Sequence, residues 1–531
     1  MAQFSSRFRR PRATAMTVAV TAVTAAALTA LSGCGAIPRL LPGAGPINTI
    51  GNVEFDTPLA IPPLAASTID TSGRRVFDLT AHQAVSHFLP GKDTTTWRFA
   101  SEDADQSYLG PTLRAARGED VVVNVHNRLP EETTVHWHGM HLPARMDGGP
   151  HQMIEPGADW SPSWTIDQPA ATLWYHPHPH GATEKHVTMG LAGMFIIDDR
   201  IEAALPLPRD YGVDDVPLIV QDARFGEDGA LTTDTRGFIG PIGDQLLVNG
   251  TLGPYLDVTT DVVRLRLLNA SAGRIFNFRL SDGHDLALIG TDGGLTEQPY
   301  ETEQIQLSPG ERAEVLVRMT PGETVTLRST GPDLGLPDAI AGRNAGNDSF
   351  DVLELRASAA LASVGTIPAR LVPMDRIAQS DASVRREFRL EGFVINNEPM
   401  RMDRIDEVVT VGDTELWSVT NGMSMPHGFH VHDVQFQVAS VGGRPPSPEL
   451  AGWKDTIYLR PDTEYRLLMR FTDYTDSDFP YMYHCHLLWH EDRGMMGQFV
   501  VVKPGQSAGT PPTKHDQNSS TDREGQGHDH H

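Results

Sequence analysis

Short runs of apolar residues recur along the whole chain and are separated by turn-forming residues. Residues 121–125 (VVVNV) and 263–267 (VRLRL) are typical of these runs. Long stretches with the 3.6-residue hydrophobic period of a helix are scarce. Glycine and proline, with 49 and 39 residues, are frequent between the runs. The pattern therefore predicts an all-β chain built from short strands.

This pattern repeats three times. In each copy a turn is followed by a valine-containing run that ends at an asparagine, namely Asn127, Asn269 and Asn421. The three asparagines are 142 and 152 residues apart, which is the size of a domain. Three domain-sized copies predict three β-sandwiches of similar topology.

The length of 531 residues agrees with about three domains. We expect a signal peptide over 1–33, a tether over 34–51, three domains over 52–203, 204–368 and 369–502, and a polar, disordered tail over 503–531.

The first 33 residues have the features of a secretory signal: a basic start and then a weakly apolar stretch over residues 13–31. The LSGC sequence that follows resembles the lipobox of bacterial lipoproteins, which implies cleavage before Cys34 and lipidation of its sulfur. We therefore expect an extracytoplasmic protein, in the periplasm or on the cell surface, that touches the membrane through a lipid anchor only. Secretion with a free Cys34 is the alternative. Arg9 and Arg10 leave the choice between Sec and twin-arginine export open.

The formal net charge is -25 at pH 7. Nucleic-acid binding needs a basic face that neutralises phosphates, so we expect no nucleic-acid partner. An acidic surface attracts cations instead. The chain has two cysteines, and lipidation of Cys34 would leave Cys485 as the sole thiol of the mature protein.

Histidines occur in pairs with one residue between them. Alternate residues of a strand point to the same face, so each pair presents two imidazoles together. The four pairs are His136 and His138, His176 and His178, His430 and His432, and His484 and His486. Eight converging imidazoles would repel one another if protonated, and a cluster of copper ions resolves this because neutral imidazole is a copper ligand. The middle copy has no pair and is expected to be a spacer.

Cys485 lies between two of these histidines and so points to the opposite face of its strand. His427 and His490 belong to the same clusters but not to the pairs, and Met495 follows. Two histidines, a cysteine and a weak axial methionine form a blue-copper electron-transfer site. One strand is therefore expected to carry ligands of two metal sites, which gives electrons a short route.

These clusters resemble the four motifs of the multicopper oxidases: HxHG, HxH, HxxHxH and HCHxxxHxxxxM. All four are present, in order, and the three-copy organisation spans roughly residues 52–502. The match is to bacterial three-domain laccases and cuprous oxidases. It implies three cupredoxin-like Greek-key β-sandwich domains and four copper ions, one of type 1, one of type 2 and two of type 3. It also implies that a reducing substrate supplies electrons for the four-electron reduction of O₂ to water.

The resemblance also implies a role for each motif residue. The type 1 copper would be bound by His427, Cys485, His490 and Met495, and the type 2 copper by His136 and His430. One type 3 copper would be bound by His138, His176 and His486, and the other by His178, His432 and His484. Asp147 and Glu491 match acidic positions with which the family delivers protons to bound oxygen. Structural roles are expected for His141, His151, His180 and His186.

The reducing substrate stays open between Cu(I) and small phenols. Soft thioethers suit Cu(I), and Met425, two residues before His427, is the best placed to guide it. Well-known cuprous oxidases carry a methionine-rich insertion, however, and residues 333–372 contain no methionine. We expect a role in copper tolerance. The alternatives are a laccase for an organic phenol or pigment and a non-enzymatic copper-sequestering lipoprotein, and copper binding by the histidine-containing tail stays open.

Overall fold

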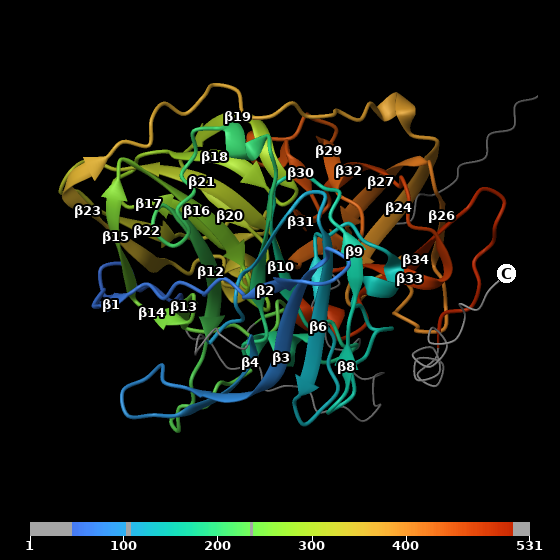
Figure 1. Ribbon diagram of the computed structural model, residues 1–531, viewed down its shortest axis with the longest axis horizontal. Coiled ribbons are helices and arrows are strands. Elements are labelled where there is room, and N and C mark those ends of the chain that lie inside the picture. Colours follow the sequence, from blue (N-terminus) through green and yellow to red (C-terminus); the bar gives the residue numbers. More distant parts are fainter. Residues whose placement is uncertain (1–44, 102–107, 234–236, 513–531) are drawn as a thin grey trace, which may run out of the picture. The chain divides into compact units, whose positions relative to one another are not determined.

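The computed structural model describes residues 45–101, 108–233 and 237–512 (Figure 1). All of them belong to one unit of the chain, Leu40–His531. The predicted signal peptide, Cys34 with its lipid, and the tail beyond residue 512 lie outside the described residues. None of the helices in the described ranges has the length and apolar character of a membrane span.

The first predicted domain consists of two sheets with an apolar core between them, drawn in blue to cyan in Figure 1. In β3, Phe77, Leu79 and Ala81 alternate with more exposed residues and face this core. One sheet has the order β2 (Ser67–Ile69), β3 (Arg75–Ser86), β6 (Asp120–Arg128) and β8 (Asp159–Trp160), with β4 (Thr94–Ala100) paired to β3 and β9 (Ser163–Thr165) paired to β6. The other has the order β5 (Leu113–Ala116), β11 (Gly193–Asp198), β10 (Ala171–His176) and β7 (His136–His138).

The middle segment forms a second pair of sheets around its own core. One has the order β1 (Thr57–Pro58), β15 (Pro254–Thr260), β23 (Phe350–Ala362), β22 (Thr324–Ser329), β17 (Phe276–Leu280) and β20 (Ile305–Leu307). The other has the order β14 (Thr251–Leu252), β13 (Gln245–Val248), β12 (Asp215–Ala223), β16 (Val262–Asn269), β21 (Arg312–Arg318), β18 (Leu286–Thr291) and β19 (Gly294–Thr302). Strand β1 comes from the first segment and pairs in parallel with β15, so the first two segments share a sheet edge.

The third segment forms a third pair of sheets, drawn in orange to red in Figure 1. One has the order β25 (Val394–Ile395), β24 (Val384–Glu391), β27 (Thr414–Asn421), β32 (Glu464–Arg470), β29 (Phe436–Val441) and β30 (Trp453–Lys454). The other has the order β26 (Glu407–Thr410), β34 (Met496–Val502), β33 (Asp476–His484), β28 (His427–Val431) and β31 (Thr456–Leu459).

Helices in the described ranges are short and lie in connections between strands. The α-helices are α1 (Thr183–Thr188), α2 (Asp338–Ala341) and α3 (Leu488–Glu491). The 3₁₀ turns are η1 (Ala144–Met146), η2 (Glu202–Ala204), η3 (Gly342–Asn344), η4 (Gln379–Asp381) and η5 (Pro448–Leu450). The predicted all-β class is confirmed.

The repeated asparagine has the same structural role in each copy. Asn127 is buried, and its amide nitrogen donates to the carbonyls of Glu131 (2.9 Å) and Ile154 (2.8 Å), while its amide oxygen accepts from the Leu129 N–H. The buried residues Asn269 and Asn421 make the same three kinds of bond in their own copies. Each asparagine therefore joins a strand end to the backbone that follows it.

Residues 503–512 differ from the expectation of a disordered tail. The Gly509 N–H donates to the Ser477 carbonyl (2.8 Å), and the Pro512 carbonyl lies 3.3 Å from Nδ1 of His151. These contacts, which the polar composition did not reveal, hold the start of the tail against the first and third segments.

A buried ionic network joins the first and middle segments. Arg266 in β16 donates two hydrogen bonds to Asp215 (2.6 and 3.0 Å), one to Glu314 (3.0 Å) and one to Thr172 of β10 (2.8 Å). Each of these side chains is buried, and the two carboxylates hold the pKa of Arg266 above its ordinary value despite the burial. The guanidinium group is therefore charged in its buried position.

Replacing Arg266 by Met should lower the free energy of unfolding by about 3–5 kcal/mol, because the buried Asp215 carboxylate would lose both hydrogen bonds from its guanidinium partner. Denaturant titration monitored by tryptophan fluorescence measures this difference. Arg318→Met is the matched control, since Arg318 pairs with Glu301 at the surface and its loss should cost little. An equal loss of unfolding free energy in the two variants would contradict a larger contribution from the buried ion pair.

Candidate metal centre

His427, Cys485 and His490 form one compact group, called here the cysteine group. The Cys485 sulfur lies 3.6 Å from Nδ1 of His427 and 3.5 Å from Nδ1 of His490, and the two nitrogens are 3.1 Å apart. Met495 is buried in the same apolar core, and its carbonyl accepts from the Cys485 N–H (3.0 Å). Strand β28 supplies His427, the turn after β33 supplies Cys485, and α3 supplies His490.

The chemistry of the cysteine group fits a soft cation. Nε2 of His490 is within hydrogen-bond distance of the Phe238 carbonyl, and donation there leaves its Nδ1 lone pair facing the sulfur. Burial raises the pKa of Cys485 to about 12 and lowers the pKa of His490 to about 4. The imidazole is therefore a neutral donor at pH 7, and a bound metal would take the place of the thiol proton.

The eight paired histidines meet on the other side of the same strand. Strand β28 pairs with β33 so that His430 lies opposite His484, and β7 pairs with β10 so that His136 lies opposite His176. The first and third segments then face each other: the rings of His136 and His432 stack at 3.8 Å. The other stacked pair across this interface, His138 and His430, has the same spacing. Each of the eight imidazoles is at most 1% exposed, so the group is closed to bulk water.

His178, His432 and His484 form the first imidazole group. The Nε2 atom of His484 lies 3.2 Å from that of His178 and 3.3 Å from that of His432. Their Nδ1 atoms face carboxylates: Glu491 at 3.3 Å from His178 and 3.2 Å from His484, and Asp147 at 2.7 Å from His432. Nδ1 of His432 donates to Asp147, and Nδ1 of His484 lies 3.2 Å from the Cys485 carbonyl, so the Nε2 lone pairs of these rings face Nε2 of His178. Only a cation satisfies all three at once.

His138, His176 and His486 form the second imidazole group. Nε2 of His138 faces Asp455 (3.1 Å), and Nδ1 of His176 faces the Pro177 carbonyl (2.9 Å). The remaining nitrogens of these two rings point at each other over 3.4 Å. Both nitrogens of His486 are buried without a hydrogen-bond partner among the described residues. Ligand atoms of His138 and His176 lie with one of His136 within 4.8 Å of one another, and the His486 ring centroid is 4.8 Å from that of His138.

His136 and His430 form a third group. Nδ1 of His136 donates to the Asp147 carbonyl and Nδ1 of His430 to the Asp455 carbonyl, each over 2.9 Å. Their Nε2 atoms are buried and have no hydrogen-bond partner among the described residues. Ligand atoms of His136, His430 and His432 lie within 4.8 Å of one another. Burial, together with the neighbouring imidazoles, lowers the pKa of His430 well below its ordinary value, so it too is a neutral donor.

The middle segment contributes to this centre, although the sequence suggested only a spacer. Arg312 of β21 donates to both carboxylate oxygens of Asp455 (2.7 and 2.6 Å) and to the Thr172 carbonyl (2.9 Å). Asp455 in turn contacts His138 through its side chain and His430 through its carbonyl. Arg312 therefore positions two histidines. The signal available in the sequence was a pair of charges inside an otherwise apolar run, residues 312–317 (RAEVLV).

The four histidines for which structural roles were expected lie outside these groups. His186 contacts Thr133 and Glu131, and His151 contacts Gln498. His180 is exposed. His141 bridges the first and third segments, as described below.

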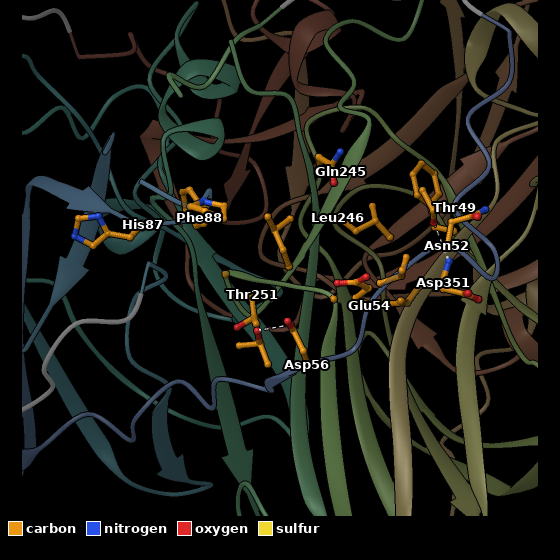
Figure 2. A pocket seen from close by; sticks show the side chains of 18 of the residues that line it. Thr49, Asn52, Glu54, Asp56, His87, Phe88, Gln245, Leu246, Thr251 and Asp351 are labelled. Carbon is orange, nitrogen blue, oxygen red and sulfur yellow. Dashed lines mark hydrogen bonds between the residues drawn. The ribbon is translucent and has the colours of Figure 1, made fainter. Parts of the chain in front are cut away.

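A hollow of about 770 Å³ lies away from the metal centre (Figure 2). It lies between the β3–β4 connection, which carries His87 and Phe88, and the segment that carries Asn52 and Glu54. None of the ten clustered histidines lines it. This hollow therefore has no part in the centre.

Three sequence profiles, each described as multicopper oxidase, match residues 93–202, 220–327 and 369–505. The chain belongs to the multicopper oxidase family. The predicted family and the cupredoxin-like all-β fold are thus confirmed, and copper is the metal that the family binds.

Relatives of this multicopper oxidase carry different names. The cell division protein FtsP of Escherichia coli K12 is 37% identical over 448 residues, which cover 84% of this chain and 92% of that protein. The laccase-like multi-copper oxidase CueO of Ochrobactrum sp. is 35% identical, with a TM-score of 0.75 over 84% of this chain and 100% of that one. A laccase from Pediococcus acidilactici is 33% identical, with a TM-score of 0.76 over 85% and 94% of the two chains.

His141 should stabilise the interface of the first and third segments in a pH-dependent way. Its ring lies between Asp433 (2.8 Å) and Asp473 (2.7 Å), next to Tyr474. Burial alone would lower the pKa of His141, but the two carboxylates outweigh it and raise the pKa to about 10. Because the pKa is raised on folding, the charged ring contributes its full stabilisation of the folded state below pH 6.5. That stabilisation is lost as the pH rises through about 10.

We therefore expect His141→Gln to lower the unfolding temperature most at pH 6 and progressively less between about pH 8 and 10. Differential scanning fluorimetry across this range measures the effect. His87→Gln, which alters an exposed pair with Asp93, serves as the control and should change little. If His141→Gln lowers the unfolding temperature equally at every pH, the His141 side chain stabilises the interface by packing and not by its charge.

Proposed function

We propose that this chain is a multicopper oxidase that couples one-electron oxidation of a reducing substrate to four-electron reduction of O₂ to water. The observation that carries the proposal is the convergence of imidazole lone pairs in three groups on one face of β33, with a thiol and two imidazoles on the other. A complete donor set of this kind is required for redox chemistry and not for packing.

The assignment of ligands follows the groups. The cysteine group with Met495 would hold the type 1 copper, and His136 and His430 the type 2 copper. The two type 3 coppers would be held by the first imidazole group (His178, His432 and His484) and the second (His138, His176 and His486). Copper in these positions supplies one-electron transfer at the cysteine group and O₂ reduction at the imidazole groups.

The chain's own residues prepare both sites. His484, Cys485 and His486 are consecutive, so the backbone joins the two sites covalently. Asp147 holds the Nδ1 proton of His432, and Glu491 lies against His178 and His484. Both carboxylates are buried beside the imidazole groups, so we assign to them the delivery of protons to bound oxygen.

The substrate would be oxidised at the edge of His490 and His427. Phe393 packs 5.2 Å from the His490 ring and 5.1 Å from Trp489, and Phe238 is 48% exposed beside them. Met423 is exposed and Met425 is buried just before His427. Aromatic rings suit a small phenol and thioethers suit Cu(I), so we propose both as substrates, with copper tolerance as the role.

We further propose that the protein works outside the cytoplasm and is anchored through a lipid on Cys34. The basic and apolar start of the sequence and its LSGC motif support this.

A role in cell division is the second candidate. It rests on the 37% identity to proteins named cell division protein FtsP. A division role that does not use copper would not require the converging donors described above, which is why oxidation is preferred.

Oxygen uptake by the copper-loaded protein tests the oxidase proposal, with Cu(I) and 2,6-dimethoxyphenol compared as substrates. We expect uptake with at least one of them. Cys485→Ser should reduce uptake to background and remove the blue absorption, because the thiolate ligand is lost. His180→Ala is the control, since His180 is an exposed neighbour outside the donor groups, and should leave uptake unchanged.

Protein that carries copper and consumes no oxygen with either substrate would refute the proposal. Faster uptake with the phenol would make the protein a laccase. A deletion strain that divides abnormally and is rescued by Cys485→Ser protein would favour the division role.

A further inference from the structure

Four methionines pack together outside the main apolar cores of the chain. Met482 and Met496 are fully buried, Met400 is 8% exposed and Met402 is partly buried. Among the described residues, the apolar side chains of this cluster are all methionines. We call these residues the methionine cluster.

The methionine cluster shares a sheet face with the metal centre. In the pairing of β33 with β34, Met496 lies opposite His484, and Met482 lies two residues before His484. Residues two apart, and residues directly opposite, point to the same face. Cys485 and the apolar core of the third segment lie on the other face. Met482 and Met496 therefore stand beside a histidine of the first imidazole group rather than in the core.

Contacts of Met482 place the cluster against the wall of the centre. Its carbonyl accepts from the His432 N–H (3.0 Å). A Cβ atom at Gly149 would lie 3.8 Å from Cγ of Met482 and 3.5 Å from the Asp147 carboxylate that holds His432. The Met482 side chain and the Asp147 carboxylate of the imidazole group therefore both border Gly149.

The outer end of the cluster is held in a fixed loop between β25 and β26. The Met400 N–H donates to the Gly494 carbonyl (2.9 Å). The side-chain amide of Gln498 donates to the carbonyls of Arg401 (3.2 Å) and Met402 (3.3 Å). Met402 is the most accessible member, so the four side chains run from the surface to the wall of the centre.

We propose that the methionine cluster is a binding site for Cu(I), from which the ion passes to the imidazole groups when the protein is loaded with copper. Thioethers are soft ligands that select Cu(I). Leucine or isoleucine would fill the same volume with a better-defined shape, so packing alone does not call for four methionines. The imidazoles are at most 1% exposed, and copper needs a route to them. The ion stays Cu(I) throughout, and only metal–ligand bonds are exchanged.

Silver(I), which has the same charge and softness as Cu(I) but no redox chemistry here, tests the binding site. Protein already loaded with copper is titrated with Ag(I) against a competing chelator, and X-ray absorption at the silver edge reports its ligands. We expect one Ag(I) per chain with sulfur ligands. Met400→Leu combined with Met402→Leu should weaken binding at least about tenfold. Met319→Leu, in the core of the middle segment, is the matched control and should not.

Equal Ag(I) affinity in the double variant and the wild type, or no sulfur-bound Ag(I) in the wild type, would overturn the site. Unfolding temperatures of the variants show that they fold, which the similar volumes of Met and Leu favour.

Transfer to the imidazoles rests on the proposed function and needs a separate measurement. Copper-free protein is mixed with Cu(I) under nitrogen, and bound copper is counted against time after rapid desalting. The double variant should load several-fold more slowly and reach the same final content. Equal rates would overturn the transfer role. Wild-type protein that binds Ag(I) at the cluster but never fills its histidines would instead refute the oxidase function and leave the binding site standing.

Discussion

The centre of this fold depends on the high cost of charging imidazoles that are buried side by side. A neutral ring has one nitrogen that donates and one that accepts. Around the eight paired histidines, oxygen atoms from fixed positions face one nitrogen of most rings, and the other nitrogen is left facing inward. The inward nitrogens repel one another unless a cation lies between them. The hydrogen bonds of the fold therefore leave buried lone pairs that a metal cation would satisfy.

The oxygen atoms that set this arrangement come from the first and third segments, and the middle segment holds one of them in place. Asp147 belongs to the first segment and Asp455 to the third, and Arg312 of the middle segment holds Asp455. Arg312 is itself fully buried, so its position depends on Thr172 as well as on the carboxylate. A buried ionic network adds little to the free energy of unfolding compared with apolar side chains of the same volume. Removing one of its charged partners, however, lowers that free energy strongly. Such networks fix the three segments in one relative placement, which a site shared between segments requires.

The sequence was most informative where the structure is local. Alternation along a strand put His484 and His486 on one face and Cys485 on the other, and the repeated asparagines marked equivalent strand ends. Contacts between distant residues left no comparable pattern: Arg312 and Asp455 are 143 positions apart, and nothing in either neighbourhood points to the other. The ordered start of the tail was missed for the same reason, since its partners lie near residues 151 and 477.

Strand β33 has a consequence for how this protein can change over evolutionary time. It ends at His484, and Cys485 and His486 follow directly with their side chains on alternate sides. One inserted or deleted residue near its end would therefore turn the thiol toward the histidines and the histidines toward the apolar core. This strand cannot shift without exchanging the side chains of two donor groups. Length variation among descendants must therefore be confined to the irregular pairing between Asp476 and Tyr481 and to the loops.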